Sequence, residues 1–118
     1  MKVKIPVNDS DYFQKLLALF SHIPPFNKIR PKELDLYARL LNYHYKVIRA
    51  PFEYRHGMVF DHDMKRKLAD EMSIEVSGVY NLLAGLRRAG IIKKDKFIPE
   101  YVFPKVKELT FIFVEEDE

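Results

Sequence analysis

Two short amphipathic patterns, joined by a few residues and closed by a glycine, constrain the fold of this chain more than any other feature. The first follows Asp61, a good helix cap, and its apolar positions are Met64, Leu68 and Met72. The second covers about residues 75–89, with its apolar stripe at Val79, Leu82, Leu83 and Leu86. Isolated helices of this length are marginal in water, so we expect the two to share one small core.

Similar spacing predicts two earlier helices. The first begins after Ser10, as its cap, and extends to about His22, where the Pro24-Pro25 pair breaks it. The second has Pro31 as its first residue and extends to about Ile48. Residues 52–57 are expected to form a loop before a very short strand at residues 58–60.

The region after the second pattern is predicted to form a hairpin. Gly90 is placed to end the helix, and the apolar residues that follow favour strands at 91–94 and 96–98 around the turn at Asp95. Lys65, Arg66 and Lys67 are predicted on the exposed side of the helix that follows Asp61.

Both ends of the chain carry strand-like patterns. Residues 2–7 alternate, and Pro6 limits them to an edge strand. Residues 109–114 are apolar on both faces, and an acidic end follows them. The apolar surface that one chain would leave uncovered predicts a homodimer; in the alternative, the first helix folds back over the last strand within one chain.

The stretch Leu68–Ile92, LADEMSIEVSGVYNLLAGLRRAGII, resembles the helix-turn-helix of winged-helix DNA-binding proteins without a gap. The matching features are Leu68 and Ala69 at the start, Ile74 in the turn, Ser77, and the final Gly90. The sequence departs from the family at Ser73, where glycine is usual, and at Glu75, where a serine cap is usual. Residues 31–60 also resemble the first helix and short strand of winged-helix domains in phage and plasmid regulatory or replication proteins.

The resemblance implies an α+β fold, a winged helix-turn-helix with added terminal strands and an N-terminal helix. Residues 1–27 would be a strand-and-helix arm, residues 28–104 the winged-helix domain, and residues 105–118 a strand with an acidic tail. The implied function is sequence-specific binding of double-stranded DNA to regulate transcription or replication, in a phage or other mobile element. The alternative is a winged-helix module that binds protein or has a structural role without binding DNA.

The expected DNA contacts follow from helical geometry and from the docking of such domains. The outward face of the recognition helix carries Ser77, Asn81 and Arg88, with Tyr80 and Arg87 beside it. Asn81 suits adenine, and Arg88 suits guanine or phosphate. Further contacts are expected from the wing and from the preceding helix: Lys93, Lys94, Lys96, Lys65, Arg66 and Lys67.

Composition supports a polyanion partner and argues against other classes. The net charge is +3, and four of the 17 acidic residues are the last four of the chain. The chain of 118 residues has no cysteine, which fits the cytoplasm, the nucleoid or a host cell's cytoplasm if the protein is viral. No apolar run is long enough to span a membrane. No spacing of histidines, carboxylates or glycines indicates an enzyme, a metal site or a cofactor.

Overall fold

Helices and one short antiparallel sheet form the part of the chain that the computed structural model describes, which is residues 2–47 and 57–116. This is an α+β arrangement. In chain order the elements are α1 (Tyr12–Phe20), η1 (Phe26–Lys28), α2 (Pro31–Lys46), α4 (His62–Met72), α5 (Val76–Arg88), β1 (Ile92–Lys93), β2 (Lys96–Phe97) and η2 (Pro99–Tyr101).

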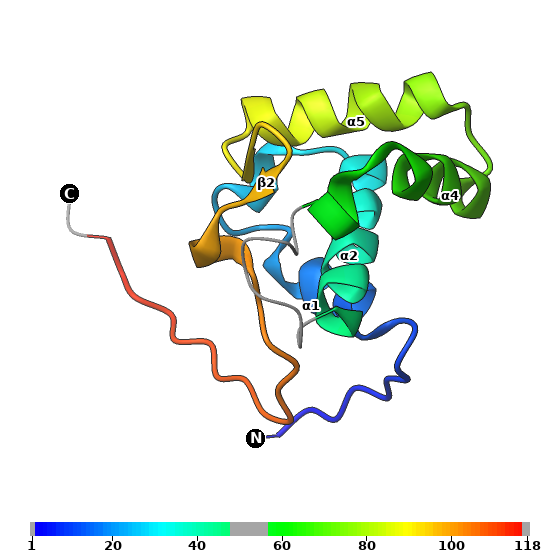
Figure 1. The fold of residues 1–118 in the computed structure, drawn as a ribbon. Coiled ribbons are helices and arrows are strands. Elements are labelled where there is room, and N and C mark those ends of the chain that lie inside the picture. The colour runs from blue at the N-terminus through cyan, green and yellow to red at the C-terminus, as the bar shows by residue number, and fades with distance from the viewer. Residues whose placement is uncertain (1, 48–56, 117–118) are drawn as a thin grey trace.

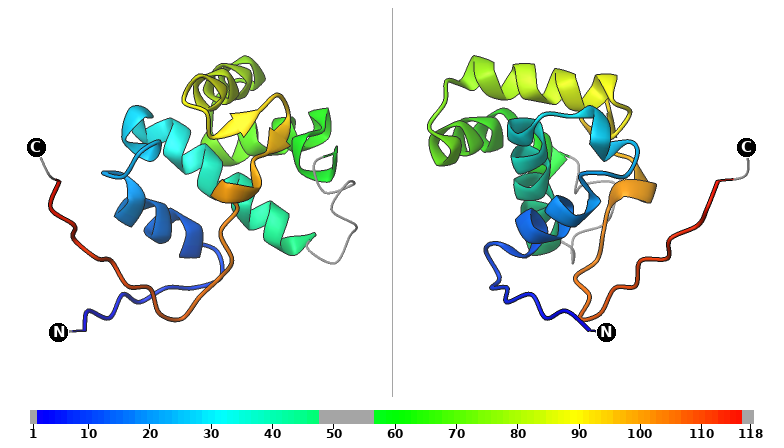
Figure 2. Two further views of the ribbon diagram at one scale, coloured as in Figure 1. Left: turned by 90° about the vertical axis from the view of Figure 1, so that its left-hand side faces the viewer. Right: turned by 180° about the vertical axis from the view of Figure 1, so that it is seen from behind.

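The helices stack from one end of the molecule to the other (Figure 1). Helix α1 packs against α2, α2 packs against α5, and α4 packs against α5. As a result α5 lies along one outer edge, with the β1–β2 hairpin near its C-terminal end, and the two views of Figure 2 agree with this placement. One apolar cluster runs through the stack, from Phe13 and Leu17 of α1 to Leu83 and Leu86 of α5.

The predicted helix boundaries are largely confirmed. Asp61 caps α4, because its Oδ1 accepts the backbone N–H of Met64 at 2.7 Å. Pro31 is the first residue of α2. Gly90 follows α5 with a φ of 79°, a conformation that suits glycine, and the N–H of Ile91 bonds back to the carbonyl of Leu86. Ser10 is not the cap of α1, which starts at Tyr12 after Asp11. The Ser10 hydroxyl instead donates to Asn8.

The predicted hairpin is present and shorter than expected. Ile92 pairs with Phe97 and Lys93 with Lys96, leaving Lys94 and Asp95 as a two-residue turn. Ile92 and Phe97 are both buried, so the hairpin is fixed to the body through its inner face. Its outer face is formed by lysines.

Three predicted strands are not strands in the structure. Residues 2–7 and 109–114 are extended and exposed, with no ladder to a neighbouring strand among the described residues. Residues 58–60 are helical, and both Val59 and Phe60 are buried. The loop expected at residues 52–57 lies outside the described residues except for Gly57, and so does the expected end of α2 at Ile48.

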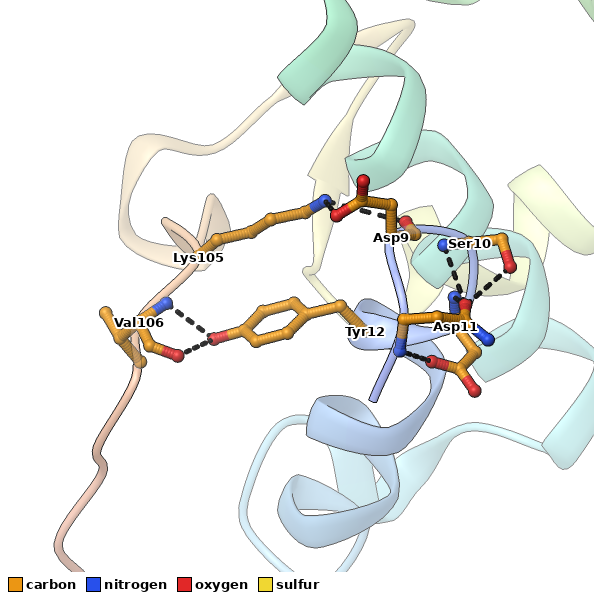
Figure 3. Close-up of polar contacts among 7 residues, drawn as sticks. Asp9, Ser10, Asp11, Tyr12, Lys105 and Val106 are labelled. Atoms are coloured by element: carbon orange, nitrogen blue, oxygen red, sulfur yellow. Dashed lines mark hydrogen bonds and ion pairs between the residues drawn. The ribbon is translucent and has the colours of Figure 1, made fainter. Parts of the chain in front are cut away.

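After η2 the chain passes along α2 to α1. The Tyr37 hydroxyl donates to the carbonyl of Tyr101, and burial raises the pKa of Tyr37, so this hydroxyl stays a donor. Phe103 then stacks on Phe20 of α1, with ring centroids 5.1 Å apart. Just beyond, Val106 meets Tyr12 in a close set of polar contacts (Figure 3). The C-terminal segment is therefore attached to α1 before it leaves the body.

Candidate nucleic-acid interface

The outer face of α5 is polar and uncovered. Ser77, Asn81 and Arg88 are exposed, and Tyr80 is 41% exposed. The opposite face holds the four buried apolar residues of the predicted stripe. Because α5 lies along an edge of the molecule (Figure 1), this face is open to a large partner. The structure thus places these four predicted residues together on one accessible surface.

The β1–β2 hairpin adds three exposed lysines beside the C-terminal end of α5. Lys93 and Lys96 are direct cross-strand partners, so two like charges face each other. Such a pair is unfavourable in a sheet, by some tenths of a kcal/mol up to about 1 kcal/mol. Lys94, in the turn, has a φ of 55°, which is uncommon for a residue with a side chain. The hairpin therefore keeps its positive charge at some cost to its own stability.

Asp95 holds the hairpin turn against both neighbouring helices. Its Oδ2 lies 2.9 Å from Nζ of Lys65 on α4, and its Oδ1 lies 3.6 Å from Nη1 of Arg87 on α5. The Lys65 side chain is only 8% exposed, so it is not on the outer side of α4 as predicted. Its ammonium is occupied within the fold, and the physical reason is that a charge this buried needs a partner. The sequence analysis does not predict a role for Asp95, although an acidic residue alone among three lysines could have indicated one.

Tyr80 connects the same region to the start of α4. The Lys65 ammonium lies 4.6 Å from the centre of the Tyr80 ring, and the Tyr80 hydroxyl lies 3.1 Å from Nδ1 of His62. His62 is exposed and was not among the predicted contacts. Its position beside Tyr80 makes it a further polar group on this surface.

The other two basic residues of α4, Arg66 and Lys67, lie beside different neighbours. Arg66 is exposed and pairs with Asp63, one turn earlier, at 3.2 Å. Lys67 lies over the ring of Tyr43 on α2, 4.9 Å from its centre. Burial, with the Glu71 carboxylate beside it, raises the pKa of Tyr43 to about 12. The structure therefore groups Arg87, Arg88 and the hairpin lysines, and it places Lys67 toward α2.

The two glycines of α5 serve contacts within the chain. Gly85 is buried against α2: a Cβ there would lie 1.5 Å from Oε2 of Glu33. The same Glu33 carboxylate accepts the backbone N–H of Arg30 at 2.8 Å, which caps the first turn of α2. At Gly78 a Cβ would come within 3.3 Å of the Ile74 side chain. Gly85 therefore allows α5 to pack closely against α2.

Gly85→Ala is expected to destabilise the protein by about 1–2 kcal/mol, although alanine is the better helix former by about 1 kcal/mol. The new methyl group must displace the Glu33 carboxylate and break the cap of α2. Urea unfolding measures the effect. In a Glu33→Ala background the clash is gone, so the same substitution should be neutral or stabilising. An equal loss in both backgrounds would show that Glu33 is not the cause.

Among the described residues, no three histidine or acidic side chains are grouped closely enough to hold a metal ion. Within the same ranges, no helix has the length and apolar character needed to cross a bilayer. The chain matches no protein-family model, no curated protein and no solved structure.

Proposed function

We propose that this chain is a sequence-specific DNA-binding protein of the winged-helix type that regulates transcription or replication. The proposal places it in the cytoplasm, on the nucleoid or in the host cell of a phage or other mobile element. The order of α2, α4, α5 and the β1–β2 hairpin supports a winged helix, as does the resemblance of residues 68–92 to that family.

One observation carries the proposal: three lysines are held together on a hairpin whose geometry sets Lys93 against Lys96, at the end of an exposed polar helix. Such a cluster is relieved by an anionic partner, and a phosphate backbone supplies anions along a line. The Asp95 contacts with Lys65 and Arg87 fix the distance from this cluster to α5. A lysine-rich surface that only aids solubility needs no such fixed position.

In the proposed complex α5 enters the major groove with its outer face toward the bases. Asn81 pairs with adenine, and Arg88 contacts guanine or a phosphate. Ser77 and Tyr80 bind phosphates at the groove edge, and the hairpin lysines follow the adjacent backbone. Lys65 does not contact DNA in this proposal, because its ammonium pairs with the Asp95 carboxylate. Arg87 interacts with both Asp95 and the DNA.

Binding to a random-sequence duplex should weaken steeply with salt. Five or six phosphate contacts would give a slope of log K against log salt near about −5, at ~0.9 per contact. Fluorescence anisotropy of a labelled duplex at several salt concentrations measures this slope. No binding, or binding that does not depend on salt, would overturn the proposal and favour the alternative, a winged-helix module whose α5 face binds protein.

A further inference from the structure

The two ends of the described chain expose several large apolar side chains. In the tail, residues 107–116, Ile112 is 80% exposed, Phe113 100% and Val114 81%. In the N-terminal segment, residues 2–7, Val3 is 74% exposed. No backbone–backbone hydrogen bond joins either segment to another described residue. Both segments are thus extended, and neither is paired with another described segment in a sheet.

Both segments leave the body from one fixed point (Figure 3). The Tyr12 hydroxyl accepts the N–H of Val106 at 2.7 Å and donates to its carbonyl at 3.0 Å. Nζ of Lys105 lies 3.7 Å from a carboxylate oxygen of Asp9. Farther along, Phe111 meets Phe20 with ring centroids 5.7 Å apart. The roots of the segments are therefore anchored, while their outer halves project from the body.

The sequences of the two segments complement each other best in the antiparallel direction. In an antiparallel register that sets Val3 against Phe113, the apolar residues Ile5 and Val7 face Phe111 and Leu109. The same register sets Lys2 opposite Val114, next to Glu115 and Glu116, and sets Lys4 opposite Ile112. In a parallel register, with Val3 against Leu109, Lys2 would face Glu108 beside Lys107, and Glu115 and Glu116 would lie beyond the N-terminal segment. The apolar residues match in either direction, and Lys2 meets two acidic residues only in the antiparallel one.

We propose that two copies of the chain exchange these segments, so that residues 2–7 of each copy pair with residues 109–114 of the other. Within one chain the described parts of the two segments run in different directions from the body, as Figures 1 and 2 show. A two-stranded ribbon of six residues is marginal alone, and the tail is apolar on both faces. A second copy supplies the missing strand and also covers the remaining face.

The proposal predicts a dimer that depends on exposed residues of the tail. The double variant Ile112→Lys, Phe113→Lys should sediment as a monomer. Its dimer dissociation constant should be at least tenfold larger than that of the wild-type protein. Thermal unfolding of the dilute protein should not change, because both side chains are exposed in the single chain. Leu19→Lys on α1, an exposed apolar position outside the two segments, is the control and should leave the dimer intact. A wild-type monomer across the micromolar range would overturn the proposal.

A charge exchange distinguishes pairing between chains from pairing within one chain. One variant carries Lys2→Glu and Lys4→Glu, and a second carries Glu115→Lys and Glu116→Lys. Each alone places the side chain at position 2 beside like charges at 115 and 116 and should weaken its own dimer about tenfold or more. An equimolar mixture should form a heterodimer, because each N-terminal segment then meets a tail of opposite charge. If mixing does not restore association, the exchange is wrong. This test uses protein alone, so its failure leaves the DNA proposal standing.

Discussion

Phe97→Ala is expected to lower the free energy of unfolding by about 3–5 kcal/mol, the usual cost of removing a buried phenylalanine. Phe97 is 4% exposed and belongs to β2. Its ring meets the rings of Tyr37, His44 and Phe60, with centroids 6.3, 4.8 and 4.9 Å away. One side chain therefore joins the hairpin to α2 and to the helical residues before α4.

Urea unfolding followed by circular dichroism measures this loss. Phe113→Ala removes the same side chain from a fully exposed position, so it should change the stability of the dilute, monomeric protein by less than about 0.5 kcal/mol. A similar cost at both positions would mean that Phe97 does not anchor the hairpin.

Replacing Lys93, Lys94 and Lys96 together by alanine should flatten the salt dependence of duplex binding by about 2 to 3 units of slope. These lysines are exposed, and two of them repel each other across the hairpin, so their removal should not unfold the protein. Anisotropy titrations at several salt concentrations, on the random duplex, give the slope. An unchanged slope would remove the hairpin from the interface.

Two controls accompany this experiment. Lys46→Ala with Lys107→Ala removes two exposed lysines that belong to neither α5 nor the hairpin, and the slope should hardly change. Asn81→Ala should instead reduce base preference at one position, at about 1–3 kcal/mol, and leave the slope nearly unchanged. A loss that is equal for all sequences would make Asn81 a positioning residue and not a base-reading one.

The features predicted well from sequence are those that depend on neighbours along the chain. Asp61 caps a helix because its carboxylate meets an N–H three residues later, and Pro31 starts a helix because its fixed φ suits that position. Gly90 ends α5 because the turn needs a positive φ. The four apolar residues of α5 follow from the period of the helix. Such signals are local, so they survive without knowledge of the fold.

The failures at the two ends of the chain and at Lys65 concern partners distant in sequence, whereas those at Ser10 and at residues 58–60 are local. Alternation at residues 2–7 and 109–114 marks segments able to form strands, but a strand forms only where another strand lies beside it. A run of three apolar residues at 58–60 cannot distinguish a strand from a buried helix. Lys65 was placed outside because lysine is rarely buried, and its partner Asp95 comes 30 residues later. The outward direction of the polar α5 face was predictable from the helical period. The contacts of Asp95 with Lys65 and Arg87, which fix the hairpin, were not.

The meeting of Gly85 with Glu33 couples the rotation of α5 to the first turn of α2. The carboxylate that caps α2 occupies the space that any side chain at position 85 would fill. If α5 turned about its own axis, a bulkier flank of the helix would enter that space and push the carboxylate from the N–H of Arg30. The rotation of α5 about its own axis, and so the face that it presents to a partner, is thus fixed by a capping contact. That contact lies on the opposite, buried side of the helix, where no partner can reach it.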